Sequence, residues 1–163
     1  AAAIARSLGT PLIIHQPAYS ILNRWVEDGL TGVLRQEGMG AIAFTPLAQG
    51  LLTDKYLGDG TAERAQQRTS LPGRRLSDEA LSVLRSLNVI AQERGQTLAQ
   101  LAIQWVLRDE VVASALIGAS RPEQLDENLA ALSGPAFDTE ELEQIDALSD
   151  RIDVDLWARS ATA

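Results

Sequence analysis

The chain has 163 residues, with 14 Lys and Arg against 22 Asp and Glu, so its formal net charge is −8. This acidity argues against nucleic acid or an anionic membrane as the main partner, because either requires a basic surface. With no cysteine and one histidine, His15, the sequence excludes disulfides and thiolate metal sites and disfavours a Ser-His-Asp triad. We therefore expect one metal-free cytoplasmic domain.

No segment of the sequence predicts a membrane span or a targeting signal. The apolar runs are all well short of the roughly 20 residues that cross a bilayer. The opening residues lack the long apolar stretch of a signal peptide. A membrane is therefore not an expected partner.

The first part of the chain combines helical patterns with two short apolar runs. The opening residues indicate the end of a helix closed by Gly9, because glycine readily adopts the positive φ of a helix C-terminus. Leu12, Ile13 and Ile14 form an apolar run without alternation, which predicts a strand buried on both faces, and residues 41–44 form a second short apolar run that also predicts a strand. Between them, residues 25–34 carry an apolar stripe at helical spacing, interrupted by Gly29.

Residues 45–76 are rich in glycine and arginine and predict a long loop. A loop of this length is uncommon inside a compact domain and is usually functional or mobile. Its basic residues are either ordinary solvated side chains or part of an anion site, and both interpretations stay open: Arg64, Arg68, Arg74 and Arg75.

Helices dominate the second half. Ser77 predicts a helix N-cap, and Thr97 and Ser120 each begin a capping-box pattern. Residues 112–117 predict a third strand, and Thr139 begins the last helix. The stripes expected on these four helices are Ala80, Leu84, Leu87 and Ala91; Leu98, Leu101, Ala102 and Trp105; Leu125, Leu129 and Leu132; and Leu142, Ile145 and Leu148.

The alternation of strands with helices predicts a parallel arrangement. Right-handed crossovers would place residues 12–16, 41–45 and 112–117 side by side in a curved, barrel-like sheet with the helices outside. Three strands would leave both sheet edges open, which is an aggregation liability. The opening helix also lacks a beginning. We therefore expect the chain to be a piece of a larger α/β sheet or barrel.

Ligands of parallel α/β folds bind at the carboxyl ends of the strands. After the third predicted strand, the turn from Gly118 to Ser120 directs backbone N–H groups toward a helix N-terminus, and Arg121 adds positive charge. This is the outline of a phosphate site, although an ordinary capped helix has the same pattern. His15 and Tyr19 are expected to have structural roles.

Three stretches of the sequence resemble the aldo-keto reductases. They are residues 16–24 (QPAYSILNR), 43–56 (AFTPLAQGLLTDKY) and 116–128 (LIGASRPEQLDEN), in the same order and with compatible spacing. Within the family the resemblance is strongest to bacterial L-glyceraldehyde 3-phosphate reductases and potassium-channel β subunits. It covers the chain except for residues 58–75 and the C-terminal tail.

The resemblance implies a (β/α)8 TIM barrel of which residues 1–163 are the C-terminal portion, with strands six to eight and their helices. It also implies that this portion binds NADP(H) in an extended form, without a Rossmann fold. The expected partners are NADPH, a small carbonyl substrate and the missing N-terminal half-barrel. A homo-oligomer is a further option.

The resemblance assigns cofactor roles to particular positions. Gln16 matches the residue that binds the nicotinamide carboxamide, and Phe44 matches the aromatic residue stacked on that ring. The pyrophosphate stretch is Thr45, Pro46, Leu47, Ala48 and Gln49, and Lys55 and Arg64 match residues that close over the cofactor. The 2′-phosphate and adenosine side is Gly118, Ser120, Arg121, Gln124, Glu127 and Asn128.

The family's catalytic Asp, Tyr, Lys and His lie on the first four barrel strands, so the resemblance implies no catalytic residue here. We do not assign their roles to Tyr19 or His15. The leading interpretation is the cofactor half of an NADPH-dependent reductase of aldehydes or ketones, inactive by itself. The alternatives are a non-catalytic nucleotide-binding or interaction module and a half-barrel that associates with itself.

Overall fold

The computed structural model describes residues 1–57 and 77–152. The strands are β1 (Ile14–His15), β2 (Gly40–Phe44) and β3 (Val112–Leu116). The helices are α1 (Ala2–Ser7), α2 (Leu30–Glu37), α4 (Asp78–Glu93), α5 (Leu98–Val106), α6 (Pro122–Leu129) and α7 (Thr139–Ser149). Four 3-10 turns complete this part of the chain: η1 (Trp25–Glu27), η2 (Ala48–Gly50), η3 (Asp54–Tyr56) and η4 (Ala130–Ser133).

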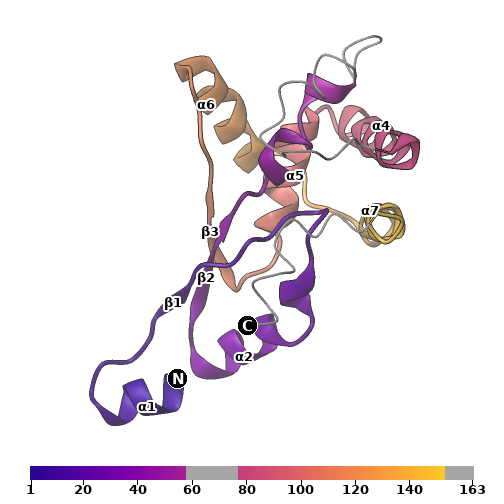
Figure 1. The fold of residues 1–163 in the computed structure, drawn as a ribbon. Coiled ribbons are helices and arrows are strands. Elements are labelled where there is room, and N and C mark those ends of the chain that lie inside the picture. Colours follow the sequence, from indigo (N-terminus) through magenta and orange to yellow (C-terminus); the bar gives the residue numbers. More distant parts are fainter. Residues whose placement is uncertain (58–76, 153–163) are drawn as a thin grey trace.

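The three strands form one parallel sheet in the order β1-β2-β3, which confirms the predicted pairing. β2 is therefore central, and β1 and β3 are the two edges. The register of β2 against β3 shifts between Ala41 and Ile42. All three strands run toward the end of the molecule at which α6 begins (Figure 1).

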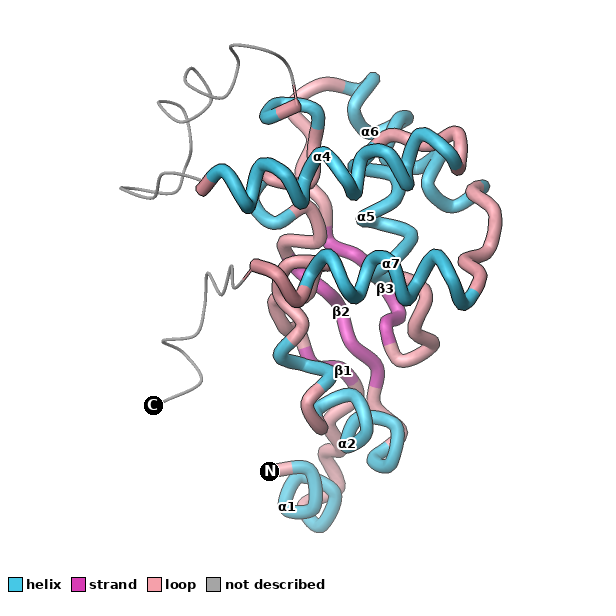
Figure 2. Tube along the Cα trace, turned by 90° about the vertical axis from the view of Figure 1, so that its right-hand side faces the viewer, coloured by secondary structure: helices cyan, strands magenta, loops and turns pink. Residues whose placement is uncertain are grey.

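The core lies between the sheet and one helical layer. Figure 2, viewed from the helical side, shows α4 and α7 in front of α5 and the strands. The stripes predicted for α4 and α5 are all buried, and Trp105 is the largest fully buried side chain in the described part. On α7, Ile145 is buried and Leu142 and Leu148 are partly buried.

Local signals placed several helix ends correctly. The Ser77 hydroxyl accepts a hydrogen bond from the Ala80 N–H at 3.1 Å, and Thr97 forms the predicted capping box with Gln100. Gly9 adopts a φ of 72° just after α1, as expected for a helix C-terminus. At the other predicted interruption, Gly29 has a φ of 95° and separates η1 from α2.

The prediction that the first strand is buried on both faces was wrong, and the third strand is exposed in the same way. Ile13 is 73% exposed and Leu116 is 53% exposed, and β1 spans two residues instead of the predicted 12–16. The reason is that β1 and β3 are edges, and the described helices cover one side of the sheet. A continuous apolar run identified the strands, but it does not contain the neighbours that would bury them.

The predicted stripe on α6 is also largely uncovered. Leu125, Leu129 and Leu132 are all exposed, although they lie at helical spacing. α6 contacts α5 and η4, so its outer apolar side faces solvent in the described structure. Apolar side chains are also exposed at the two sheet edges, as at Ile13 and Leu116.

Candidate functional site

The segments that follow β1 and β2 are joined by backbone hydrogen bonds. The Phe44 N–H donates to the Pro17 carbonyl at 2.9 Å, and the Tyr19 N–H donates to the Phe44 carbonyl at 3.2 Å. Phe44 is also paired with Leu116 in the sheet register. Gln16 and Phe44 thus belong to neighbouring strand ends, as the sequence predicted.

The chain after β2 contains unusual backbone conformations. Thr45, Ala48 and Gln49 have φ values of 55°, 47° and 57°, a region that residues with a Cβ rarely occupy. Each such residue costs roughly 1 kcal/mol or more, and such strain concentrates at ligand sites. These residues belong to the predicted pyrophosphate stretch, and nothing in their identities signalled the strain.

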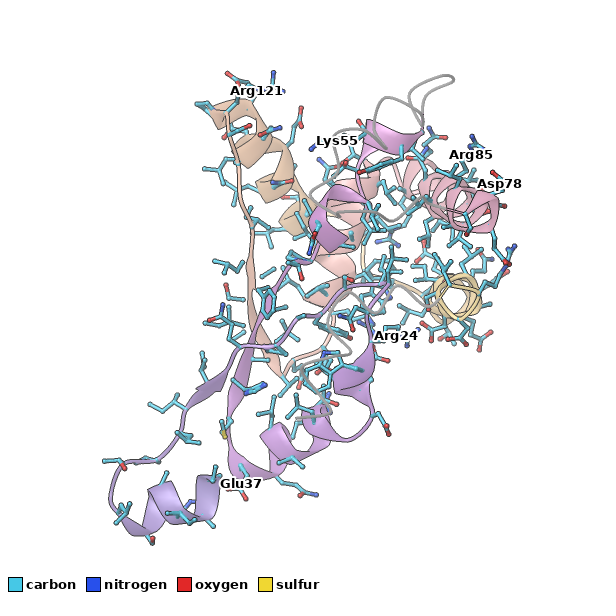
Figure 3. The ribbon with its side chains drawn as sticks, viewed as in Figure 1. Arg24, Glu37, Lys55, Asp78, Arg85 and Arg121 are labelled. Atoms are coloured by element: carbon cyan, nitrogen blue, oxygen red, sulfur yellow. The ribbon has the colours of Figure 1, made fainter. Side chains whose placement is uncertain are left out.

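Two cations lie near the carboxyl ends of the strands. Lys55 follows β2 and Arg121 precedes α6, and Figure 3 places both at the same end of the molecule. Both are exposed, and neither forms an ion pair with another residue in ranges 1–57 and 77–152. Lys55 Nζ lies 3.7 Å from the point where a Cβ on Gly50 would sit. The predicted Arg64 lies outside the described residues.

The start of α6 differs from the predicted capping box at Ser120. The N-cap is Arg121, which is extended at φ −143° and ψ 148°, and no side chain caps the helix. Pro122 explains the shift, because proline favours the first helical position and forces an extended conformation on the residue before it. Instead, Gln124 Oε1 accepts hydrogen bonds from the Ser120 N–H at 2.9 Å and the Ser120 hydroxyl at 3.0 Å.

The remaining predicted adenosine residues lie farther along α6. The Glu127 carbonyl accepts a hydrogen bond from Gln100 Nε2 at 2.9 Å, which ties α6 to the start of α5. The Asn128 side chain is only 8% exposed and forms no hydrogen bond with any described residue. The sequence analysis did not identify the contact of Gln100 with α6. The only pattern to which Gln100 belongs in the sequence is the capping box with Thr97.

A polar cluster on the core side of this region holds Tyr19. Its hydroxyl donates to Glu27 Oε1 at 2.6 Å and accepts a hydrogen bond from Arg108 Nη1 at 2.9 Å. Arg108 Nη2 also donates to Glu27 Oε1 at 3.1 Å. On the other side of the carboxylate, Arg24 Nη2 donates to Glu27 Oε2 at 2.7 Å, and Arg24 Nη1 reaches Asp146 on α7 at 2.7 Å.

Trp105 provides the platform for this cluster. The Tyr19 ring centroid lies 5.3 Å from that of Trp105, and the guanidinium carbons of Arg108 and Arg24 lie 3.5 and 5.2 Å from the Trp105 ring centroid. Cations over an aromatic face are attracted to it. The five charged and aromatic side chains of Tyr19, Arg24, Glu27, Trp105 and Arg108, here called the Tyr19 cluster, therefore form one interlocked unit.

The environment of Tyr19 makes it a poor proton donor. Burial raises the pKa of its phenol far above the ordinary value, and the Glu27 carboxylate raises it further, although Arg108 opposes them. Burial alone would raise the pKa of Glu27, but hydrogen bonds from Arg24, Tyr19 and Arg108 outweigh burial and lower it. Both pKa directions agree with the structural role that the sequence analysis expected for Tyr19.

The Tyr19 cluster predicts a specific pH dependence of stability. Below the ordinary Glu27 pKa of 4.5, the unfolded chain binds a proton that the folded chain resists, so stability falls as the pH drops through the folded pKa. We expect Glu27→Gln to be less stable than the unaltered chain at pH 7, and the difference to be smaller at a pH below the ordinary Glu27 pKa of 4.5. Urea unfolding at both pH values measures it. A difference that does not vary with pH would contradict the assignment.

Two other kinds of site receive no support from the described residues. No helix in ranges 1–57 and 77–152 is long and apolar enough to cross a membrane. Within the same ranges, no three or more His, Asp and Glu side chains are grouped so that they could hold a metal ion.

Comparison with known proteins identifies the family. The model of the "Aldo/keto reductase family" matches residues 1–150. L-glyceraldehyde 3-phosphate reductases of Escherichia coli O157:H7 and K12 are 49% and 47% identical over 93% and 97% of this chain. A putative voltage-gated potassium channel subunit beta of Schizosaccharomyces pombe is 36% identical over 74% of it.

Solved structures show the same fold. The glycerol dehydrogenase of Gluconobacter oxydans superimposes on 86% of this chain with a TM-score of 0.71 at 24% identity, and this chain covers 43% of it. An aldo-keto reductase of Bacillus halodurans matches 94% of this chain with a TM-score of 0.66 at 24% identity, and 49% of that protein is covered. The chain spans 45% and 47% of the two Escherichia coli relatives, about half their length. It belongs to the aldo-keto reductase family.

Proposed function

We propose that the chain is the C-terminal, cofactor-binding half of an NADPH-dependent reductase of aldehydes or ketones, with β1, β2 and β3 as barrel strands six to eight. The observation that carries the proposal is the convergence of Gln16, Phe44 and the turn before α6 at the carboxyl end of one parallel sheet. This is the end at which α/β barrels bind ligands.

The residues present suit such a cofactor. Gln16 is exposed and offers an amide for the nicotinamide carboxamide, and Phe44 is an aromatic residue of the kind that stacks on such a ring. The strained turn after Phe44 would hold the pyrophosphate, and Lys55 Nζ lies close to Gly50 in the same stretch of chain. Arg121 and the N-terminus of α6 suit a 2′-phosphate. When bound, NADPH supplies the hydride for carbonyl reduction.

The proposal requires a second half for catalysis. Tyr19 is buried and its hydroxyl is engaged by Glu27 and Arg108, so it does not offer a proton to a substrate. A proton donor from the remaining strands would complete the reaction. The same strands would pair with the open edges of β1 and β3 and cover the exposed leucines of α6.

We expect the 163-residue chain alone not to oxidise NADPH with an aldehyde above the rate in buffer. Joined to the N-terminal half of the Escherichia coli L-glyceraldehyde 3-phosphate reductase, it should restore turnover. A chimera that folds but neither binds NADPH nor turns over would contradict the proposal. So would turnover by the chain alone that is lost on Tyr19→Phe.

The exposed apolar edges also favour one alternative, association of the chain with itself. A sizing column run with and without the N-terminal half distinguishes self-association from pairing with that half. A 1:1 complex with that half supports the proposal. A dimer of the chain that does not accept the half would favour self-association.

A further inference from the structure

The inference starts from the backbone that carries the proposed nicotinamide side of the site. Gln16 lies three residues before Tyr19, and Phe44 is bonded to both ends of the intervening segment. The Phe44 N–H donates to the Pro17 carbonyl, and its carbonyl accepts from the Tyr19 N–H. Ala18 is paired with Phe44 in an isolated parallel bridge. The backbone hydrogen bonds therefore tie Phe44 to the segment that connects Gln16 and Tyr19.

The Tyr19 side chain anchors this segment in the core. Tyr19 is 1% exposed, and its hydroxyl lies between Glu27 and Arg108. Arg24 extends this hydrogen-bond network to α7, because it donates to Glu27 and also to Asp146 and Ser149. Figure 3 places Arg24 between the segment after β1 and α7. The Tyr19 side chain thus contacts Trp105 of α5 and Glu27 of η1, and Glu27 is linked through Arg24 to α7.

The hydroxyl of Tyr19 both donates and accepts, and phenylalanine can do neither. Its removal would leave Arg108 Nη1 and Glu27 Oε1 each without one partner in a largely buried cluster. The ring would keep its contact with Trp105, so the change removes hydrogen bonding and retains the packing. Unpaired groups of this kind rearrange or admit water, and the backbone attached to them loses its constraint.

We infer that Tyr19 is a positioning residue that holds Gln16 and Phe44 in place for the nicotinamide end of the cofactor. This inference rests on the proposed function. Tyr19 touches neither substrate nor cofactor. It acts through the backbone hydrogen bonds to Phe44, and the contacts of the Tyr19 cluster hold its side chain in place.

The test compares two ligands on the 163-residue chain and its Tyr19→Phe variant. NADPH contains the nicotinamide, whereas adenosine 2′,5′-bisphosphate contains only the adenosine and 2′-phosphate side. We expect Tyr19→Phe to weaken NADPH about tenfold, equivalent to about 1.4 kcal/mol, and to leave the bisphosphate unchanged. Equal effects on both ligands, or no effect on NADPH, would overturn the inference.

A control separates positioning from general loss of stability. Ser77→Ala removes the N-cap of α4 and should destabilise the chain by a comparable amount. It should not change the ratio of the two dissociation constants. If it changes that ratio as Tyr19→Phe does, the effect is one of stability and the inference fails.

A second readout does not depend on any cofactor. Hydrogen exchange of the Phe44 and Tyr19 amides reports the two bonds directly. Tyr19→Phe should accelerate exchange at these amides more than at α4 amides, whereas Ser77→Ala should do the reverse. Unaltered exchange at Phe44 would overturn the inference even if NADPH binds. Failure of the unaltered chain to bind either ligand, with the expected exchange pattern, would count against the proposed function and not against the anchoring of Phe44.

Discussion

Replacing Arg121 with alanine in the barrel with both halves present should weaken NADPH binding by roughly ten- to a hundredfold and leave NADH binding nearly unchanged. Arg121 is exposed at the N-cap of α6 and forms no ion pair within the described ranges. A 2′-phosphate carries roughly two negative charges, and a charge-assisted contact contributes about 1.5–3 kcal/mol. At about 1.4 kcal/mol per decade, this gives the stated range.

The informative quantity is the ratio of the NADPH and NADH dissociation constants. General damage to the site would weaken both cofactors alike, whereas loss of a phosphate contact affects NADPH alone. Arg85→Ala is the matched control, because Arg85 is an exposed arginine on α4, away from Arg121 (Figure 3). If Arg121→Ala raises the dissociation constants of NADPH and NADH equally, another cation binds the 2′-phosphate. The candidates are then Lys55 and the arginines of residues 58–76.

The second large effect is expected from Trp105→Ala, which should lower the free energy of unfolding by about 3–5 kcal/mol. Trp105 is fully buried and supports Tyr19, Arg24 and Arg108. Its Nε1 has no hydrogen-bond partner among the described residues, so the loss is one of packing and of the platform beneath two guanidinium groups. At about 2–4 °C per kcal/mol, Tm should fall by roughly 6–20 °C.

Trp25→Ala is the comparison variant. Trp25 is 43% exposed, and its Nε1 donates to the Ala18 carbonyl at 3.1 Å, so its removal costs one hydrogen bond and partial packing. We expect a loss of about 1 kcal/mol in urea unfolding. Equal losses for the two tryptophans would show that the cluster around Trp105 is not a principal source of stability.

Much of the fold could be predicted because its signals are local. The Ser77 cap and the Thr97 capping box depend on residues three positions apart, so the sequence contains the whole interaction. The parallel sheet followed from apolar runs that alternate with helical stripes. The start of α6 also depends on neighbouring residues. Pro122 determines where the helix begins, whereas the predicted capping box relied on the Ser120 hydroxyl.

The candidate site was only partly predictable. Gln16 and Phe44 were identified through resemblance, whereas the turn before Arg121 was already visible as the outline of a phosphate site, and their placement at neighbouring strand ends follows from the parallel topology. The positive φ values of Thr45 and Ala48 were not predictable, because surrounding contacts impose them against the preference of the residues themselves.

The sequence by itself determined the capped helices and the acidic, cysteine-free chemistry of the chain, because each depends on composition or on neighbours within a few positions, and the alternation of strands with helices determined the parallel pairing. Only the tertiary structure decided which apolar residues are covered and what holds Tyr19. Arg108 lies 89 positions from Tyr19, and Asp146 lies 122 positions from Arg24, so no local pattern relates them. Their contacts exist because the crossovers bring α7 and the end of α5 onto the same side of the sheet, next to the fully buried Trp105.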